Sequence, residues 1–483
     1  MNYISIYFYL FVGILLVVYY ILPKRYRWFV LLAGSMVFYY RLSEKGFKMF
    51  VVTILLSYSM GYLLDYMHNT GKSVIKCRIA LAGCLAIIAL PLIVTKEGDF
   101  VLQSLLHRRT YSWIVPVGLS FYTLQIVSYL VDVSRGKVRA QKNLGKYALF
   151  VSFFPQIIQG PIPRYEQMNP QLFEGHSFKE ESFLKGVQMI VWGFFLKLMI
   201  ADKASIVVNT IFLGWEAYRG GYVLVAGILY SIQLYADFLS CPCLAKGVAE
   251  LFDIHLGENF QQPYMSRSIK EFWGRWHISL SSWLKDYIYI PLGGNRKGRW
   301  RKYIHLIITF SISGMWHGAG YKYIFWGLMH AFYQVCGELT RNSRDKIFCW
   351  LGIGTEGRIR EYIRCISTCF FVMLAWIIFR AGSLRIGLSM LYSMVTVYNP
   401  WIFFDDSLLT LGLSWKEWGV LLVSVWLLYK VEHIQRECCV REKILRQPRV
   451  IRWGIYLGAV AVIMIFGTYG YGFDASDFIY GGF

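Results

Sequence analysis

Residues 304–336 read IHLIITFSISGMWHGAGYKYIFWGLMHAFYQVC, and this stretch is the most informative about the kind of protein the chain forms. It is longer than the roughly 20 apolar residues that cross a bilayer as one helix. Lys322 is its only lysine or arginine, so the stretch is suited to a water-poor environment. Glycines interrupt it at positions 314, 318, 320 and 327. The pattern therefore predicts a membrane-embedded segment that is broken near its middle.

The rest of the chain is similarly apolar. Of its 483 residues 56% are hydrophobic and only 16% are charged, whereas a soluble domain carries about 25% charge. Runs such as 4–21, 221–240 and 453–471 are continuous and do not alternate, which favours helices over a β-barrel. The sequence predicts an all-α polytopic membrane protein with about 11–13 spans. The expected helices lie near 3–22, 27–40, 48–66, 78–95, 113–133, 144–160, 185–212, 220–240, 304–336, 365–381, 384–399, 416–430 and 453–471.

The positive charge is concentrated in loops. The formal net charge is +21, from 50 Lys+Arg against 29 Asp+Glu. In a soluble protein this would suggest nucleic acid, but in a membrane protein it predicts cytoplasmic loops near anionic lipid. An anionic ligand, such as a nucleotide-bearing acyl donor, is a second explanation. Because Lys24, Arg25 and Arg27 follow the first apolar run, we expect an uncleaved first helix with the N-terminus outside.

The same rule orients the other end of the chain. The basic stretch 433–452 is expected in the cytoplasm, which places the tail 472–483 outside. We find no internal repeat and no long linker, so we expect a single integral-membrane domain over residues 1–483. The ten cysteines do not suggest a disulfide framework, and the pair Cys241 and Cys243 lacks the nearby ligands of a zinc site. We therefore expect no metal.

Residues 253–302 are not an ordinary loop. Within them, Phe272-Trp-Gly-Arg-Trp-His-Ile-Ser-Leu280 and the sequence as far as Gly294 interleave aromatic and charged residues. Aromatic residues of this kind favour the interface of a membrane, and irregular backbone at membrane depth needs protein or a water cavity around it. The stretch predicts re-entrant or interfacial helices that line a cavity.

Two histidines are candidates for chemistry. His317 lies inside an apolar stretch, where ionisable residues are costly and usually face the interior of the helix bundle, and histidine suits general acid–base catalysis near neutral pH. The alternative is a core histidine bonded to a carbonyl. His277 lies in the tryptophan-rich stretch, where an interfacial histidine is the alternative. On one regular helix His330 would point about 220° away from His317, and we expect it to face elsewhere.

Other polar residues are weaker candidates for a polar path. Asp237 is a lone carboxylate in an apolar run and is equally suited to a structural ion pair, as is Asp286 beside Lys285. Gln125 could line the path or join two helices. Asn295 and Arg296 follow two glycines and could hold the phosphate of a donor, although the spacing is not that of a nucleotide-hydrolysing loop. No serine stands in a nucleophile-elbow pattern.

Four motifs carry a resemblance. They are Pro116–Gln125 (PVGLSFYTLQ), Phe153–Arg164 (FFPQIIQGPIPR), Glu271–Leu280 (EFWGRWHISL) and Ser313–Gly318 (SGMWHG). In order and spacing the chain resembles the membrane-bound O-acyltransferase (MBOAT) family, in its bacterial branch of alginate and peptidoglycan O-acetyltransferases and teichoic-acid D-alanylation proteins. The matching core covers about residues 116–330, followed by C-terminal helices over 365–471, and the ending Phe478-Ile-Tyr480 is similar too.

The resemblance implies a site and a fold. The catalytic histidine of the family falls on His317 and its second functional histidine on His277, beside Trp316 and Trp276 in the same motifs. The family forms a ring of helices around a thin central region with a tunnel. One position departs: where the family often reads Tyr-x-Asp-Phe-Ser-Gly-Tyr-Ser-Asp, this chain keeps Asp237 but has Cys243 in place of the second aspartate.

The resemblance also implies a reaction. A cytoplasmic thioester, acetyl-CoA or an acyl-carrier thioester, would donate its acyl group toward a cell-surface polysaccharide. The protein would lie in a bacterial cytoplasmic membrane, and a secreted SGNH-type esterase would be its partner. Acetyl is preferred because the chain is longer than expected of the D-alanylation proteins. D-alanyl transfer to teichoic acid from a carrier protein is the alternative. A polysaccharide or ion transporter is a rival of another class, but it predicts paired repeats or several intramembrane charges, and neither is found.

Overall fold

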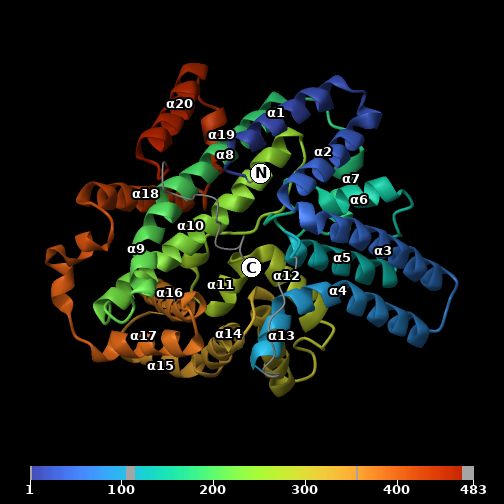
Figure 1. The fold of residues 1–483 in the computed structure, drawn as a ribbon. Coiled ribbons are helices and arrows are strands. Elements are labelled where there is room, and N and C mark those ends of the chain that lie inside the picture. Colours follow the sequence, from blue (N-terminus) through green and yellow to red (C-terminus); the bar gives the residue numbers. More distant parts are fainter. Residues whose placement is uncertain (1–2, 105–114, 355–356, 470–483) are drawn as a thin grey trace. The chain divides into compact units, whose positions relative to one another are not determined.

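The computed structural model describes residues 3–104, 115–354 and 357–469 of the chain. Every regular element in these ranges is a helix, which confirms the all-α class (Figure 1). The chain forms two compact units. Of the described residues, unit 1 comprises those up to 193 together with 241–257, and unit 2 comprises 194–240 and those from 258 to 469. We describe each unit by itself, and the single membrane domain expected from the sequence stays a prediction.

Unit 1 is built from the N-terminal helices and the end of a long helix, α10. Within it α2 packs against α1 and α6, and α5 packs against α3 and α4. Its helices are α1 (Ile6–Ile21), α2 (Arg27–Leu42), α3 (Glu44–Asn69), α4 (Val74–Ser104), α5 (Leu119–Ser134), α6 (Leu144–Ser152), α7 (Tyr165–Phe173) and α8 (Glu180–Phe194), with a short 3₁₀ turn, η1 (Lys24–Tyr26).

Unit 2 contains the larger share of the chain. Its α14 packs against α13 and α16, and α16 packs against α17. Its helices are α9 (Asp202–Leu213), α10 (Gly221–Leu251, up to residue 240), α11 (Ile269–Arg275), α12 (Ile278–Leu284), α13 (Arg299–His317), α14 (Tyr321–Leu339), α15 (Arg341–Trp350), α16 (Arg358–Arg380), α17 (Leu384–Thr396), α18 (Trp415–Ile434), α19 (Val440–Leu445) and α20 (Arg449–Phe466). Short 3₁₀ and π segments are η2 (Phe195–Ala201), η3 (Pro263–Met265), η4 (Lys285–Tyr289), η5 (Pro400–Phe403) and η6 (Asp406–Leu411).

Six helical segments of the described residues are long and apolar enough to cross a membrane, and α1 is a shorter apolar helix. This supports a multi-pass membrane protein. The six segments are Glu44–Asn69, Val74–Gly98, Glu180–Leu213, Gly221–Leu251, Arg358–Arg380 and Arg449–Phe466. Other expected spans correspond to helices that are shorter or more polar. The count of about 11–13 spans, the ring and the tunnel therefore stay predictions, and the tail 472–483 lies outside the described residues.

Several expected helices have different boundaries, and two of them are shortened for clear local reasons. The helix expected at 144–160 ends at Ser152, because Pro155 follows closely and the residue before a proline is biased away from helical conformation. The helix expected at 113–133 begins only at Leu119, directly after Gly118 in a left-handed conformation with φ of 74°. Both differences lie where proline or glycine sets the backbone.

The broken segment 304–336 is confirmed as two helices. Helix α13 ends at His317, and α14 begins at Tyr321. The two helices come close because glycines face the partner's backbone. A Cβ atom on Gly314 would lie 2.9 Å from the carbonyl carbon of Tyr323, and one on Gly327 would lie 3.0 Å from that of Phe310. This hairpin places His317 at the end of a helix that packs tightly on its neighbour.

Residues 253–298 form no long helix, and their re-entrant or interfacial position stays a prediction. Between 258 and 298 the chain makes only the short elements η3, α11, α12 and η4, which are three to seven residues long. Helix α11 has a side-chain cap, because Ser268 accepts a hydrogen bond from the backbone N–H of Glu271. Helix α12 has no side-chain cap from its N-cap residue, His277.

In unit 1, Asp253 anchors the end of α10. It is 3% exposed and has a positive φ of 60°. Its carboxylate accepts a hydrogen bond from the Ser182 hydroxyl at 2.7 Å, lies 2.8 Å from the Lys179 ammonium and faces His176 at 3.3 Å. Burial raises the pKa of Asp253, but the hydrogen bonds from Lys179 and Ser182 outweigh it and hold this pKa below its ordinary value.

The first prediction concerns the glycine contact of the hairpin. Gly327→Ala should destabilise the protein by about 1–3 kcal/mol, since overpacking forces the backbone of α13 away. The measurement is the thermal midpoint of the detergent-solubilised full-length protein. Gly337→Ala is the matched control in the same helix, because among the described residues no atom beyond its own helical turns lies within 4 Å of its Cβ position, and it should be neutral or stabilising. Equal midpoints for the two variants would contradict the packing argument.

The second prediction concerns Asp253. Because its pKa is lowered in the folded state, its stabilising contribution is present above its unfolded value and is lost as the pH falls through the folded value. Asp253→Asn should therefore lower the thermal midpoint at pH 7, and the difference from wild type should shrink below about pH 4. Asparagine tolerates the positive φ, so the variant tests the charge. A difference that is constant from pH 7 to pH 3 would rule out this explanation.

Candidate active site

His317 ends α13 inside an aromatic cage. Its side chain is 2% exposed. The ring of Trp326 from α14 stands nearly perpendicular to the imidazole at 5.0 Å, and that of Phe379 from α16 does so at 5.5 Å. Three helices that pack on one another therefore hold this histidine in apolar surroundings. The sequence placed His317 in an apolar stretch, and the structure adds the neighbours that exclude water from it.

His277 lies between α11 and α12 in a strained backbone conformation. It is 1% exposed, with φ of 45° and ψ of 53°. A positive φ is uncommon for a residue other than glycine and often marks a functional position. Phe238 from α10 packs perpendicular to its ring at 4.7 Å. Complete burial lowers the pKa of His277 from its ordinary value to about 3, so the imidazole is neutral at pH 7.

Trp316 joins the two histidines. Its ring centroid is 4.9 Å from that of His317 and 6.1 Å from that of His277. The two imidazoles, 40 residues apart in sequence, therefore flank one indole in unit 2. This is the central geometric feature of the site, since it brings both predicted histidines into one cluster.

His330 belongs to the same cluster, contrary to the expectation that it faces elsewhere. That expectation assumed one regular helix, but the break after His317 resets the rotation. His330 is fully buried, and Trp326 stands between the two rings, 5.0 Å from His317 and 4.9 Å from His330. Trp273 from α11 covers His330 at 5.0 Å.

Trp276 and Asp237 form parts of the wall. Trp276 is 1% exposed and stacks on Phe272 at 5.4 Å, so it is a core residue beside His277. Asp237 lies one position before Phe238 and pairs with the Lys197 ammonium at 2.7 Å. The structural ion pair considered for Asp237 from the sequence is therefore present.

Lys197 was missed in the sequence, although it is a lone cation in an apolar run. It bridges two buried carboxylates, Asp237 and, at 3.0 Å, Asp202. It lies in the π-helical segment η2, between α8 and α9. Ionisable residues at membrane depth usually pair with one another, and this rule would have linked Lys197 to Asp237 in advance.

The remaining candidates lie on other elements of the chain than the histidines. Asp286 is half-buried on η4, and Asn295 and Arg296 are exposed on the turn between η4 and α13. Gln125 belongs to unit 1, where its amide donates to the carbonyl oxygen of Phe150 at 2.6 Å and thereby joins α5 to α6. This contact agrees with the alternative that Gln125 holds two helices together.

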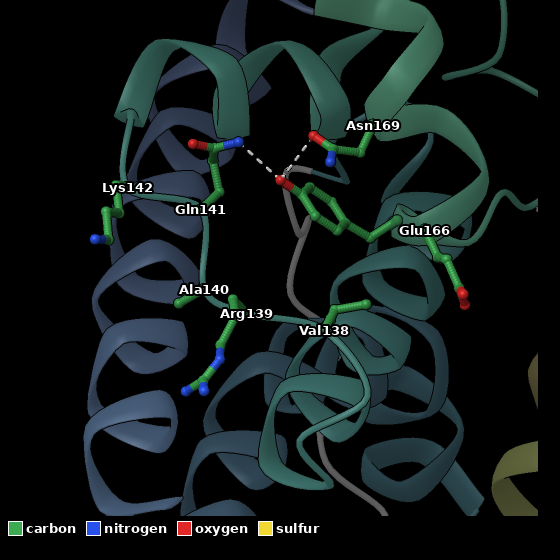
Figure 2. Close-up of a pocket in the computed structure, with 8 residues that line it drawn as sticks. Val138, Arg139, Ala140, Gln141, Lys142, Glu166 and Asn169 are labelled. Carbon is green, nitrogen blue, oxygen red and sulfur yellow. Dashed lines mark hydrogen bonds between the residues drawn. The ribbon is translucent and has the colours of Figure 1, made fainter. Parts of the chain in front are cut away.

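A surface pocket of about 470 Å³ is found in unit 1 (Figure 2). The hydroxyl of Tyr165, one of its lining residues, donates a hydrogen bond to Asn169 and accepts one from Gln141. The pocket contains none of the three histidines of the cluster, and its lining is that of an exposed groove. We therefore do not assign the chemistry to it. The lining residues are Val138, Arg139, Ala140, Gln141, Lys142, Tyr165, Glu166 and Asn169.

Comparison with known proteins defines the class. The model of the membrane-bound O-acyltransferase family matches residues 103–381, more than half of the chain. The matched range contains all four motifs that carried the resemblance and both histidines of the Trp316 cluster. The protein is therefore a membrane acyltransferase.

Relatives agree with this class over most of the chain. A probable alginate O-acetylase AlgI of Pseudomonas fluorescens is 32% identical over 397 residues, 82% of this chain and 76% of the relative. The peptidoglycan O-acetyltransferase of Helicobacter pylori is 32% identical over 406 residues, 76% of this chain and 73% of the relative. The teichoic acid D-alanyltransferase of Bacillus subtilis is 29% identical over 317 residues, 63% of this chain and 79% of the relative. The chain belongs to the membrane-bound O-acyltransferase family.

The third prediction concerns the buried ion pairs. Lys197→Met removes the cation that two buried carboxylates share and should cost about 3–5 kcal/mol, whereas Asp237→Asn leaves Lys197 paired with Asp202 and should cost less. Thermal midpoints of the purified full-length variants give the order. Lys416→Met at an exposed position is the control. The explanation fails if Asp237→Asn is the more damaging change.

Proposed function

We propose that this protein transfers an acyl group, acetyl in preference to D-alanyl, from a cytoplasmic thioester toward a cell-surface polysaccharide. His317 and His277 are the proposed catalytic residues. The observation that carries the proposal is the pair of buried imidazoles that flank Trp316. The preference for acetyl rests on the relatives, since the two named for O-acetyl transfer align over more of this chain than the D-alanyltransferase does.

The reaction needs a proton to move from one oxygen to one sulfur. The acceptor hydroxyl attacks the thioester carbonyl, the C–O bond forms and the C–S bond breaks. His317 takes the hydroxyl proton as general base. His277 relays a proton so that the departing thiolate leaves as a thiol. Donor and acceptor thus become ester and thiol with no other co-reactant.

The aromatic surroundings support transfer over hydrolysis. His317 and His277 are 2% and 1% exposed, and the rings of Trp326, Phe379 and Phe238 cover them. A thioester held there would meet the acceptor hydroxyl and little water. The same low-polarity setting strengthens each hydrogen bond that a substrate makes with the two imidazoles.

The donor is proposed to approach from the basic side. Arg296, Lys297 and Arg299 are exposed near the start of α13, where they attract the phosphates of acetyl-CoA or of an acyl carrier. By the positive-inside rule this side is cytoplasmic in a bacterial inner membrane, and both termini are outside. A secreted SGNH-type esterase is the proposed partner, which would receive the acyl group and pass it to the polysaccharide.

The fourth prediction tests the role of His317. His317→Ala should lower polymer acylation by about 10²–10⁴-fold, the usual loss for a general base, while the protein still inserts into the membrane. The measurement is ester-linked acyl content of the cell-surface polymer in a deletion strain complemented with each variant. His433→Ala, an exposed histidine at the end of α18, is the control and should retain acylation. Wild-type acylation by His317→Ala would refute the assignment.

The acyl group is decided in the same strains. Mass analysis of the esters released from the polymer should give acetate in the wild-type complemented strain and none in the deletion strain. Release of D-alanine instead would favour the alternative, for which the Bacillus subtilis relative is the supporting observation.

A further inference from the structure

Asn259 is a buried polar residue that lies outside the four sequence motifs and was not predicted as a site residue. It is 1% exposed and precedes η3 in unit 2. Its side-chain oxygen accepts hydrogen bonds from the backbone N–H of Ser279 at 3.2 Å and from the Ser279 hydroxyl at 2.8 Å, and it lies 3.2 Å from Nδ1 of His277. One amide therefore touches both the catalytic candidate and the helix that follows it.

The orientation of this amide is determined by its neighbours. Oxygen and nitrogen of an asparagine are usually assigned from the hydrogen-bond network. A backbone N–H is only a donor, so the Asn259 atom that faces Ser279 N–H is the carbonyl oxygen. The flipped orientation would set an NH₂ group against this N–H and lose the bond in a buried position.

The orientation of the amide determines the tautomer of the histidine. The oxygen that faces Ser279 also faces Nδ1 of His277, and an oxygen acceptor requires a proton on that nitrogen. Because burial keeps His277 neutral at pH 7, its second nitrogen, Nε2, carries a lone pair and no proton. Among the described residues this buried Nε2 has no hydrogen-bond partner.

Asn259 also holds the backbone of the site. Its backbone carbonyl oxygen accepts a hydrogen bond from the N–H of Ile278 at 2.8 Å, so Asn259 satisfies two N–H groups at the start of α12, where the N-cap residue His277 makes no side-chain capping bond. These bonds offset the strain of the positive φ at His277, which is of order 1–3 kcal/mol. Backbone and ring of His277 are thus held by the same residue.

We propose that Asn259 is a positioning residue that fixes His277 as the Nδ1–H tautomer and so presents Nε2 as the acceptor of the proton that His317 takes from the substrate hydroxyl. When Nε2 receives this proton, the Asn259 oxygen stays bonded to Nδ1–H and stabilises the imidazolium, and Nε2 then passes the proton to the departing sulfur. The tautomer is independent of the proposed function, while its use in proton transfer rests on that function.

The direct test is the protonation of each ring nitrogen. Full-length protein in lipid bilayers, labelled with ¹⁵N in the histidine rings, is measured by nitrogen NMR at pH 7, and the His277→Gln spectrum identifies the signals of His277. Wild type should show a protonated Nδ1 and an unprotonated Nε2. Asn259→Ala should give the other tautomer or a mixture, and Asn259→Asp should keep the proton on Nδ1. An unprotonated Nδ1 in wild type, or no change in Asn259→Ala, overturns the proposal.

The same variants, assayed for polymer acylation, provide the fifth prediction. Asn259→Ala should lose about 10–100-fold, less than the roughly 10⁴-fold that a wrong histidine tautomer can cost, whereas Asn259→Asp restores the acceptor and should recover most of the activity. A carboxylate favours the imidazolium, so Asn259→Asp should also shift the pH profile upward, which a structural role would not do. Equal losses in both variants, with both still folded by thermal midpoint, contradict the positioning role.

The NMR and acylation measurements test the role of Asn259 and the proposed function separately. If His277→Gln retains full acylation while NMR gives the Nδ1–H tautomer, the proposed use of His277 fails and the assignment of its tautomer by Asn259 stands. If acylation depends on His277 but the tautomer is the opposite one, the proposed function stands and the role of Asn259 is refuted.

Discussion

In surroundings that offer little water, a buried polar group of this chain gains most from a partner within the protein, and this constraint organises much of the site. The amide of Asn259 satisfies a helix start and an imidazole together. Lys197 forms ion pairs with two carboxylates. The amide of Gln125 donates a hydrogen bond to a backbone carbonyl oxygen near the end of α6. In the hairpin of α13 and α14, glycines without side chains allow the two backbones to pack closely.

The class of fold could be predicted because the apolar composition and the long apolar runs extend over the whole chain. The break in 304–336 could also be predicted, since glycines are visible in sequence. Helix ends were less predictable: α5 starts late because Gly118 adopts a left-handed conformation, a choice that depends on its surroundings. The prediction that His330 faces away from His317 was wrong for a similar reason. It assumed one continuous helix, whereas the turn between α13 and α14 changes the rotation.

The candidate site was predictable in its two histidines and not in what connects them. His317 and His277 stand out as polar residues in aromatic and glycine-rich motifs, whereas Trp316 acquires its meaning only when the chain folds and both rings reach it. Asn259 carries no signal in sequence, since a single asparagine before a turn is ordinary. Its importance arises from contacts 18 and 20 residues away, which no local pattern contains.

The π-helical segment η2 has a consequence for how this chain can vary. Residues five apart on an α-helix point about 140° away from each other, yet Lys197 and Asp202, five apart, meet at 3.0 Å, because the backbone there is widened and Asp202 N–H bonds to Lys197 O. Loss of one residue from 195–201 would restore an ordinary helix and separate the charges. Length is thus constrained here as strictly as residue type, and related sequences should align through this segment without gaps.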